Sequence, residues 1–231
     1  MSRVGFFRAC WIVAAKDLRL EWRTWETLSS TLIFSLTVLV VFQFAFGLGT
    51  VREVGVERLV PGIIWTVVAF ASVVGMVRSL QLERPQDTLG ALFLAPVDRG
   101  AVYGGKMLAN LVKLVILEAV LLPMTAVLFS YDLIPILMPL ALVLFVHGLG
   151  LTELGTLFAG VTTRLGRGEA LLAVLLFPAA SPLLISAVKC TGTVMEGGSL
   201  SEVSNWLMIS VGLDLLYLMV ALMTFEFVLE E

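Results

Sequence analysis

One stretch of the sequence decides the fold: residues 107–158 read MLANLVKLVILEAVLLPMTAVLF (107–129), SYDL (130–133) and IPILMPLALVLFVHGLGLTELGTLF (134–158). The two apolar runs are separated by only four residues. A helix needs about 20 mainly apolar residues to cross the hydrocarbon core of a bilayer. The stretch therefore predicts two consecutive membrane-spanning helices joined by a tight turn.

Four further windows have the same length and character, at 28–46, 60–77, 171–188 and 206–229. The chain has 231 residues, of which 59% are hydrophobic and 14% are charged. Soluble domains contain about 45–50% apolar and about 25% charged residues, so the surplus of apolar side chains must face lipid. The sequence predicts an all-α integral membrane protein with six transmembrane helices.

The basic residues are distributed unequally between the two sides of these spans. Eleven lie on the side of the amino terminus, against three on the other side (Arg52, Arg58 and Lys189), and Lys113 lies inside the third span. Lys and Arg favour the cytoplasmic side of a membrane. We therefore expect a cytoplasmic amino terminus, and an even number of spans returns the carboxyl terminus to the same side.

The polar residues argue against several classes of function. The net charge of −3 gives no basic field for nucleic acid. Cys10 and Cys190 are expected on opposite sides of the membrane, which argues against a disulfide between them, and they lack the spacing of a metal site. With His147 as the single histidine, no Ser–His pair or His-Glu-x-x-His run is identifiable. We expect no catalytic constellation and no metal site in this chain.

Residues 1–26 form a separate predicted unit ahead of the six-helix transmembrane segment 27–231. Apolar residues recur at three- and four-residue steps, and basic residues lie mostly on the other side of the same helix. The apolar positions are Phe7, Cys10 or Trp11, Ala14, Leu18, Trp22 and Trp25. This pattern predicts an amphipathic helix lying in the headgroup plane. The alternative is a charged leader that only sets the topology.

Residues 100–106, GAVYGGK, match the first seven positions of the phosphate-binding P-loop. The next residue is Met107, where that loop needs a Ser or Thr hydroxyl to bind Mg²⁺. The match also precedes a membrane span and follows no predicted strand. We interpret it as a chance match, so ATP binding by this route is not expected.

The loop 78–106 contains a short amphipathic segment outside the membrane. Pro85 suits a first helical turn and Asp87 favours the positive end of a helix, while Pro96 ends the segment. Leu89, Leu92 and Phe93 form one apolar face. Such a helix either docks in a groove of a cytoplasmic partner or rests on the bilayer surface, and the residue pattern alone supports both alternatives equally.

Three ionisable residues inside the predicted spans are candidates for a functional role, because charges at membrane depth are costly and often functional. Glu118 and Glu153 are candidates for a substrate-facing or gating role, and a buried structural pair or a protonated carboxyl explains them equally well. His147 is expected to join helices by hydrogen bonds rather than to bind haem or metal. Small residues on the fourth span predict a packing seam (Gly148, Gly150, Gly155 and Gly160).

Several segments together resemble a known family. The loop reads Glu83…Thr88-Leu89…Leu92…Ala95-Pro96-Val97-Asp98-Arg99…Gly105-Lys106. It is similar to the cytoplasmic signature of ABC export permeases, and more narrowly to the B subunit of the cytochrome c maturation system, the haem exporter permease CcmB. Residues 16–21 (KDLRLE), 61–65 (PGIIW), 155–159 (GTLFA) and 171–182 also fit. Asp87 departs from the glycine common in that family.

The resemblance implies an ABC-2-like permease of the bacterial inner membrane that pairs with a separate cytoplasmic ATPase and other cytochrome c maturation membrane subunits. It favours the docking alternative for the loop and implies a homodimer or a second permease-like subunit. ATP would act through the partner, and haem would be cargo rather than a bound cofactor. The implied ATPase-coupling residues are Glu83, Asp87, Thr88, Leu89, Leu92, Phe93, Pro96 and Arg99.

Two alternatives to this function stay open. The first is an export permease for another cargo, such as a lipid, a drug or a polysaccharide. The second is a scaffold that positions haem-handling partners without transporting anything.

Overall fold

The computed structural model describes residues 5–81, 99–164 and 168–228, and side chains within 5–46, 53–79, 99–162 and 170–225. Among these residues the secondary structure is helical throughout. The elements are α1 (Phe6–Thr24), α2 (Glu26–Val54), α3 (Val56–Gln81), α5 (Arg99–Phe129), the short 3₁₀ helix η2 (Ile134–Ile136), α6 (Leu137–Arg164), α7 (Gly168–Met195) and α8 (Ser204–Val228).

The structure confirms the six predicted spans. Its candidate spans are Glu26–Phe46, Val56–Ser79, Arg99–Phe129, Ile134–Thr162, Ala170–Met195 and Ser204–Phe225. The largest difference from the prediction is in α5, which begins at Arg99 rather than at 107. Residues 99–106 are not apolar enough to be counted by hydropathy, but they continue the helix because α1 packs against them.

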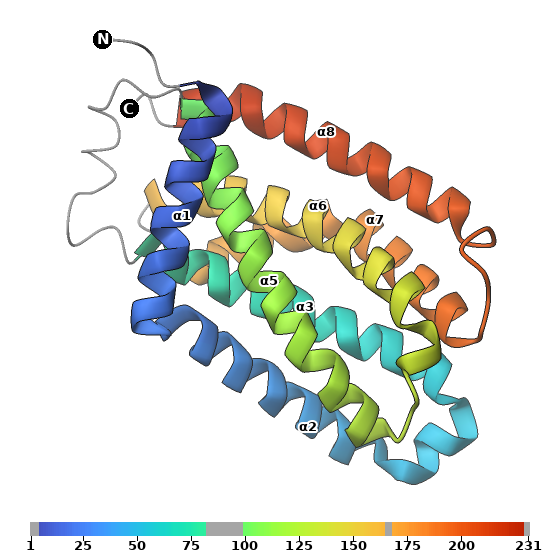
Figure 1. The fold of residues 1–231 in the computed structure, drawn as a ribbon. Helices are drawn as coiled ribbons and strands as arrows, with labels where there is room; N and C mark the ends of the chain where they lie inside the picture. Colours follow the sequence, from blue (N-terminus) through green and yellow to red (C-terminus); the bar gives the residue numbers. More distant parts are fainter. Residues whose placement is uncertain (1–4, 82–98, 165–167, 229–231) are drawn as a thin grey trace.

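The spans lie side by side, and α1 crosses one end of the bundle (Figure 1). Helix α3 occupies the centre, in contact with α2, α5, α6 and α7. Its Trp65 and Ile64 are among the most completely buried large side chains. Helix α8 is peripheral, and most of its apolar side chains remain exposed. Exposed apolar side chains on outer helices are expected where lipid rather than water is the solvent.

The glycines of α6 form the predicted packing seam, and each one faces a different neighbour. Gly148 lies against Leu114 of α5, Gly150 against Asp214 of α8, Gly155 against Met76 of α3, and Gly160 against Phe225 of α8. A Cβ at Gly160 would already lie 3.1 Å from the Phe225 ring. Small residues at these steps let α6 approach three helices closely.

A sharp corner connects α1 to α2 at Trp25. This residue has φ 53° and ψ 18°, the left-handed conformation that ends many helices. The Trp25 N–H donates to the Glu21 carbonyl at 2.7 Å, and the Leu28 N–H donates to Glu21 Oε1 at 2.8 Å. Glu21 is buried, so its carboxylate caps the positive amino-terminal end of α2.

The predicted amphipathic helix is confirmed as α1, but only part of its apolar stripe contacts the protein. Its buried apolar side is formed by Ala9, Val13 and Ala14 and faces α5. The large rings of the predicted stripe, such as Trp11 and Trp22, remain exposed. Of the buried apolar residues only Ala14 belongs to the predicted stripe, so the packed face is formed mainly by small residues outside it.

Candidate functional site

Helix α1 packs against the end of α5 that lies next to the predicted coupling loop; we call this contact, centred on Gly105, the seat of α1. A Cβ at Gly105 would lie 2.6 Å from Val13 Cβ and 2.7 Å from the Cys10 carbonyl oxygen, so only a glycine allows this approach. One residue later, Lys106 Nζ lies 3.4 Å from Asp17 Oδ2; the Lys106 side chain is buried and Asp17 is half-buried. The segment 100–106 is therefore helical and packs against α1, instead of forming a phosphate-binding loop.

Most predicted ATPase-coupling residues lie outside the described residues. These are Glu83, Asp87, Thr88, Leu89, Leu92, Phe93 and Pro96. Arg99 is described: it is half-buried and is the first residue of α5. Because α3 ends at Gln81 and α5 begins at Arg99, the loop connects two helices of the bundle, and α1 rests directly on the first turns of α5.

His147 is the centre of a buried hydrogen-bond network that joins three spans. Its Nδ1 lies 2.7 Å from the Val143 carbonyl, and its Nε2 lies 3.1 Å from Ser186 Oγ of α7 and 3.0 Å from Ser210 Oγ of α8. A carbonyl can only accept, so Nδ1 carries the proton and Nε2 accepts from a serine. The two hydroxyls are 2.8 Å apart and both reach the Trp206 carbonyl.

The network extends to the central helix through an aromatic ring. The Trp65 ring lies edge-on to His147 with centroids 5.5 Å apart, and its Nε1–H donates to Thr191 Oγ1 at 2.9 Å. Both ring nitrogens of His147 are engaged within the protein, so the side chain has no nitrogen available for iron in this arrangement. The hydrogen bonds agree with the prediction that His147 joins helices.

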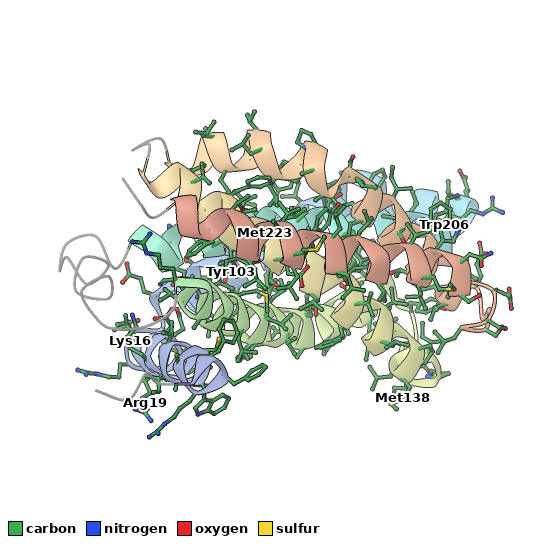
Figure 2. All side chains as sticks on the ribbon, turned by 90° about the horizontal axis from the view of Figure 1, so that it is seen from above. Lys16, Arg19, Tyr103, Met138, Trp206 and Met223 are labelled. Atoms are coloured by element: carbon green, nitrogen blue, oxygen red, sulfur yellow. The ribbon has the colours of Figure 1, made fainter. Side chains whose placement is uncertain are left out.

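Glu153 lies on α6 one turn after Gly150, the position against which Asp214 of α8 packs. It is buried on α6, and its electrostatic neighbour is Asp214 of α8. Glu153 Oε2 and Asp214 Oδ1 are buried without a hydrogen-bond partner among the described residues. The Tyr103 hydroxyl donates to the Glu153 backbone carbonyl at 3.0 Å, which fixes α5 against α6 next to this pair. Figure 2 shows Tyr103 within the bundle.

Glu118 occupies a different interface from Glu153. Its side chain lies against Gly148, where α5 meets α6, and Oε1 is another buried oxygen without a partner among the described residues. The structure therefore does not bring Glu118 and Glu153 together as one pair. Asp214 was recognisable as an ionisable residue in a span, but its position against Gly150 of α6 depends on the relative positions of α6 and α8, which no local pattern encodes.

A small cavity lies between α2, α3 and α5 near the end that carries α1. Its volume is about 30 Å³, enough for one or two water molecules. Thr27 Oγ1 and Asn110 Oδ1 line it and have no partner among the described residues. Lys113 also lines the cavity and donates to Ser79 Oγ at 2.9 Å. The cavity is suited to hydrate polar atoms in the half of the bundle that carries α1.

Among the described parts of the chain, no group of three His, Cys, Asp or Glu side chains is arranged to hold a metal ion. Cys10 and Cys190 are not joined in a disulfide. The polar groups of the spans thus occur as separate clusters at helix interfaces, and α6 contributes to each of them except the cavity.

The chain is similar to proteins of one family over nearly its whole length. The family described as CcmB protein matches residues 8–230. A protein of Rhodobacter capsulatus named heme exporter protein B is 30% identical over 183 residues, covering 79% of this chain and 82% of that protein. A protein of the same name from Bradyrhizobium diazoefficiens is 26% identical over 182 residues, covering 79% of this chain and 80% of that one.

Proposed function

Because this chain belongs to the CcmB protein family, we propose that it is the membrane permease subunit of an ABC-type haem exporter that serves cytochrome c biogenesis. The observation that carries the proposal is the family match over residues 8–230 of a chain with six candidate spans. Two relatives named heme exporter protein B support haem as the cargo. ATP hydrolysis would occur in a separate cytoplasmic ATPase, and this chain would carry no catalytic residues.

The proposed route of coupling runs through the loop 78–106 into the bundle. Leu89 and Leu92 would dock on the ATPase, and movement of the loop would reach α3 and α5, the helices that it connects. The close seat of α1 at Gly105 supports this route, because interlocked helices move together rather than separately. The termini would lie in the cytoplasm, with the protein in the bacterial inner membrane.

Glu118 and Glu153 remain candidates for a substrate-facing or gating role under this proposal. Both are buried between helices, and each has a carboxylate oxygen without a partner among the described residues. Asp214 joins this group through Glu153. Relative movement of α6 against α5 or α8 would change the surroundings of these carboxyl groups directly.

The experiment that tests the function is purification of the tagged chain from its native membrane with its companions. We expect an ABC ATPase and haem-handling membrane proteins, and ATPase activity that depends on the presence of this chain. An ATPase accompanied by proteins for another cargo would contradict haem export alone. Haem-handling companions without any ATPase would instead identify a scaffold.

The docking segment is tested by Leu89→Asp combined with Leu92→Asp. We expect the double variant to insert into the membrane normally and to lose the ATPase during purification, because charge on an apolar docking face opposes burial. Leu200→Asp is the matched control, since Leu200 is an exposed residue between α7 and α8 at the opposite end of the bundle. Retention of the ATPase by the double variant would show that the loop is not the docking element.

A further inference from the structure

The helix α1 has three distinct sides, only one of which is used for packing. The packed side carries small residues and faces α5. A second side carries large aromatic rings that remain exposed, with exposed fractions of 85% for Phe7, 66% for Trp11 and 55% for Trp22, and Trp25 directly after the helix is 48% exposed. A third side carries exposed basic residues, namely Arg8, Lys16, Arg19 and Arg23. The aromatic and basic sides adjoin along the helix.

The acidic side chains of α1 face the protein, whereas its exposed charged side chains are basic. Its two acidic residues both turn inward, since Asp17 pairs with Lys106 and Glu21 caps α2. Asp17 also pairs with Lys16 at 3.0 Å. All exposed charged side chains of α1 are basic, although the whole chain has a net charge of −3. Figure 2 shows Arg19 on the side of α1 away from the bundle.

The position of α1 places both unused sides at a boundary between apolar and polar surroundings. It crosses the bundle where the apolar spans end (Figure 1). Tryptophan rings are favoured at headgroup depth, and Arg side chains reach past apolar surface to place their charge in the polar layer. A contiguous apolar patch beside a basic row is the arrangement of helices that bind anionic membrane surfaces.

We propose that the exposed aromatic and basic sides of α1 form a binding surface for anionic phospholipid headgroups. The rings enter the layer below the phosphates, and Arg8, Arg19 and Arg23 bind the phosphate groups. Headgroup binding holds α1 down on its seat at Gly105 and so fixes the first turns of α5. The surface is independent of the cargo, so its test does not depend on the proposed haem export.

A test uses the whole chain reconstituted in phosphatidylcholine vesicles that contain increasing amounts of brominated phosphatidylglycerol. Bromine quenches tryptophan only at close range, so quenching reports the lipid next to α1. The background variant Trp206→Phe removes the indole at the opposite end, and Trp65 is only 1% exposed. Quenching by brominated phosphatidylcholine gives the neutral reference, and the ratio is the association constant of anionic relative to neutral lipid.

The decisive comparison is between Arg19→Gln with Arg23→Gln and a control with the same loss of charge. The control is Arg58→Gln with Lys189→Gln, which alters two exposed basic residues at the other end of the bundle. We expect a constant above one for the parent chain. Each arginine contributes roughly up to fivefold, so the α1 variant should lower the constant severalfold, towards the contribution of the remaining Arg8, and the control should leave it unchanged. Salt of about 0.5 M should reduce it in the parent chain.

Three results would overturn the proposal. The first is a relative constant of one for the parent chain, and the second is an equal fall in the control. The third is an α1 variant that keeps its preference for anionic lipid but no longer purifies with a cytoplasmic ATPase. That result would assign the basic side to a protein partner instead of the membrane.

Discussion

The contact between α1 and α5 makes the sharpest prediction, through the variant Gly105→Ala. The added Cβ would meet Val13 Cβ at 2.6 Å, Val13 Cγ1 at 2.9 Å and the Cys10 carbonyl oxygen at 2.7 Å. A backbone oxygen cannot turn away as a side chain can, so α1 itself must move. Overpacking of this kind costs about 1–3 kcal/mol.

The same substitution also stabilises the helix, and a control variant is needed to separate this effect from the overpacking. Alanine is favoured over glycine in a helix by about 0.8–1.0 kcal/mol. Gly212→Ala is the matched control, since Gly212 lies in α8 and a Cβ there would meet nothing within 4 Å. The control should gain stability and Gly105→Ala should lose it or stay level. The difference between them of about 1–3 kcal/mol corresponds to about 2–4 °C in midpoint temperature per kcal/mol.

Two measurements check this prediction. One is the thermal unfolding midpoint of both variants in the same detergent. The other is the rate at which a maleimide labels Cys10, which is partly buried next to Gly104 on α5; Cys190, which is fully buried, is the internal reference. Labelling of Cys10 should accelerate in Gly105→Ala and not in Gly212→Ala. If Gly105→Ala gains stability as the control does and Cys10 labels at the parent rate, α1 is not seated on α5 in this way.

Three further substitutions give independent tests. Asp17→Asn leaves the buried Lys106 without its carboxylate, and we expect a loss of about 1–3 kcal/mol, seen as a lower unfolding midpoint; an unchanged midpoint would contradict the pairing. His147→Leu removes hydrogen bonds at both ring nitrogens and should cost about 1–3 kcal/mol, without changing the haem absorption spectrum of the purified complex; a changed spectrum would instead identify an iron ligand. Hydrogen bonds from the Ser199 N–H and hydroxyl lower the pKa of Glu202. These bonds therefore stabilise the folded protein above the ordinary glutamate pKa, and this stabilisation is lost as the pH falls through the lowered value. Ser199→Ala should raise that pKa, as measured by NMR titration, and an unchanged titration would refute the assignment.

The membrane-spanning helices were predictable because a single physical requirement, burial of apolar side chains in lipid, acts on about 20 consecutive residues at once. The stretch 107–158 shows two consecutive spans and the four-residue turn between them, directly before η2. The amphipathic period of α1 was visible for the same reason. What the period could not show is which side of α1 packs, since that depends on Gly105, about 90 residues away in the sequence.

The sequence predicted the candidate site only as a set of ionisable residues that are energetically unfavourable inside a membrane span. An ionisable side chain in a span is noticeable by itself, so Glu118, Glu153 and His147 could be named from the sequence. Their neighbours could not be named, because the position of Asp214 against Gly150, one turn before Glu153, requires the rotation and depth of two helices relative to each other. The serines around His147 gave no signal, since a hydroxyl in a span usually bonds to its own helix backbone. The coupling residues, Arg99 excepted, stay predictions from the resemblance.

The corner at Trp25 has a mechanical consequence. Glu21 holds it from both sides, accepting one hydrogen bond at its carbonyl and one at its carboxylate from the following helix. Only Trp25 separates the end of α1 at Thr24 from the start of α2 at Glu26. The two helices are therefore connected rigidly and should move as one body. A tilt of α1 would therefore change the tilt of α2, the first span. Glu21→Ala removes the carboxylate that holds the corner and should uncouple these two movements.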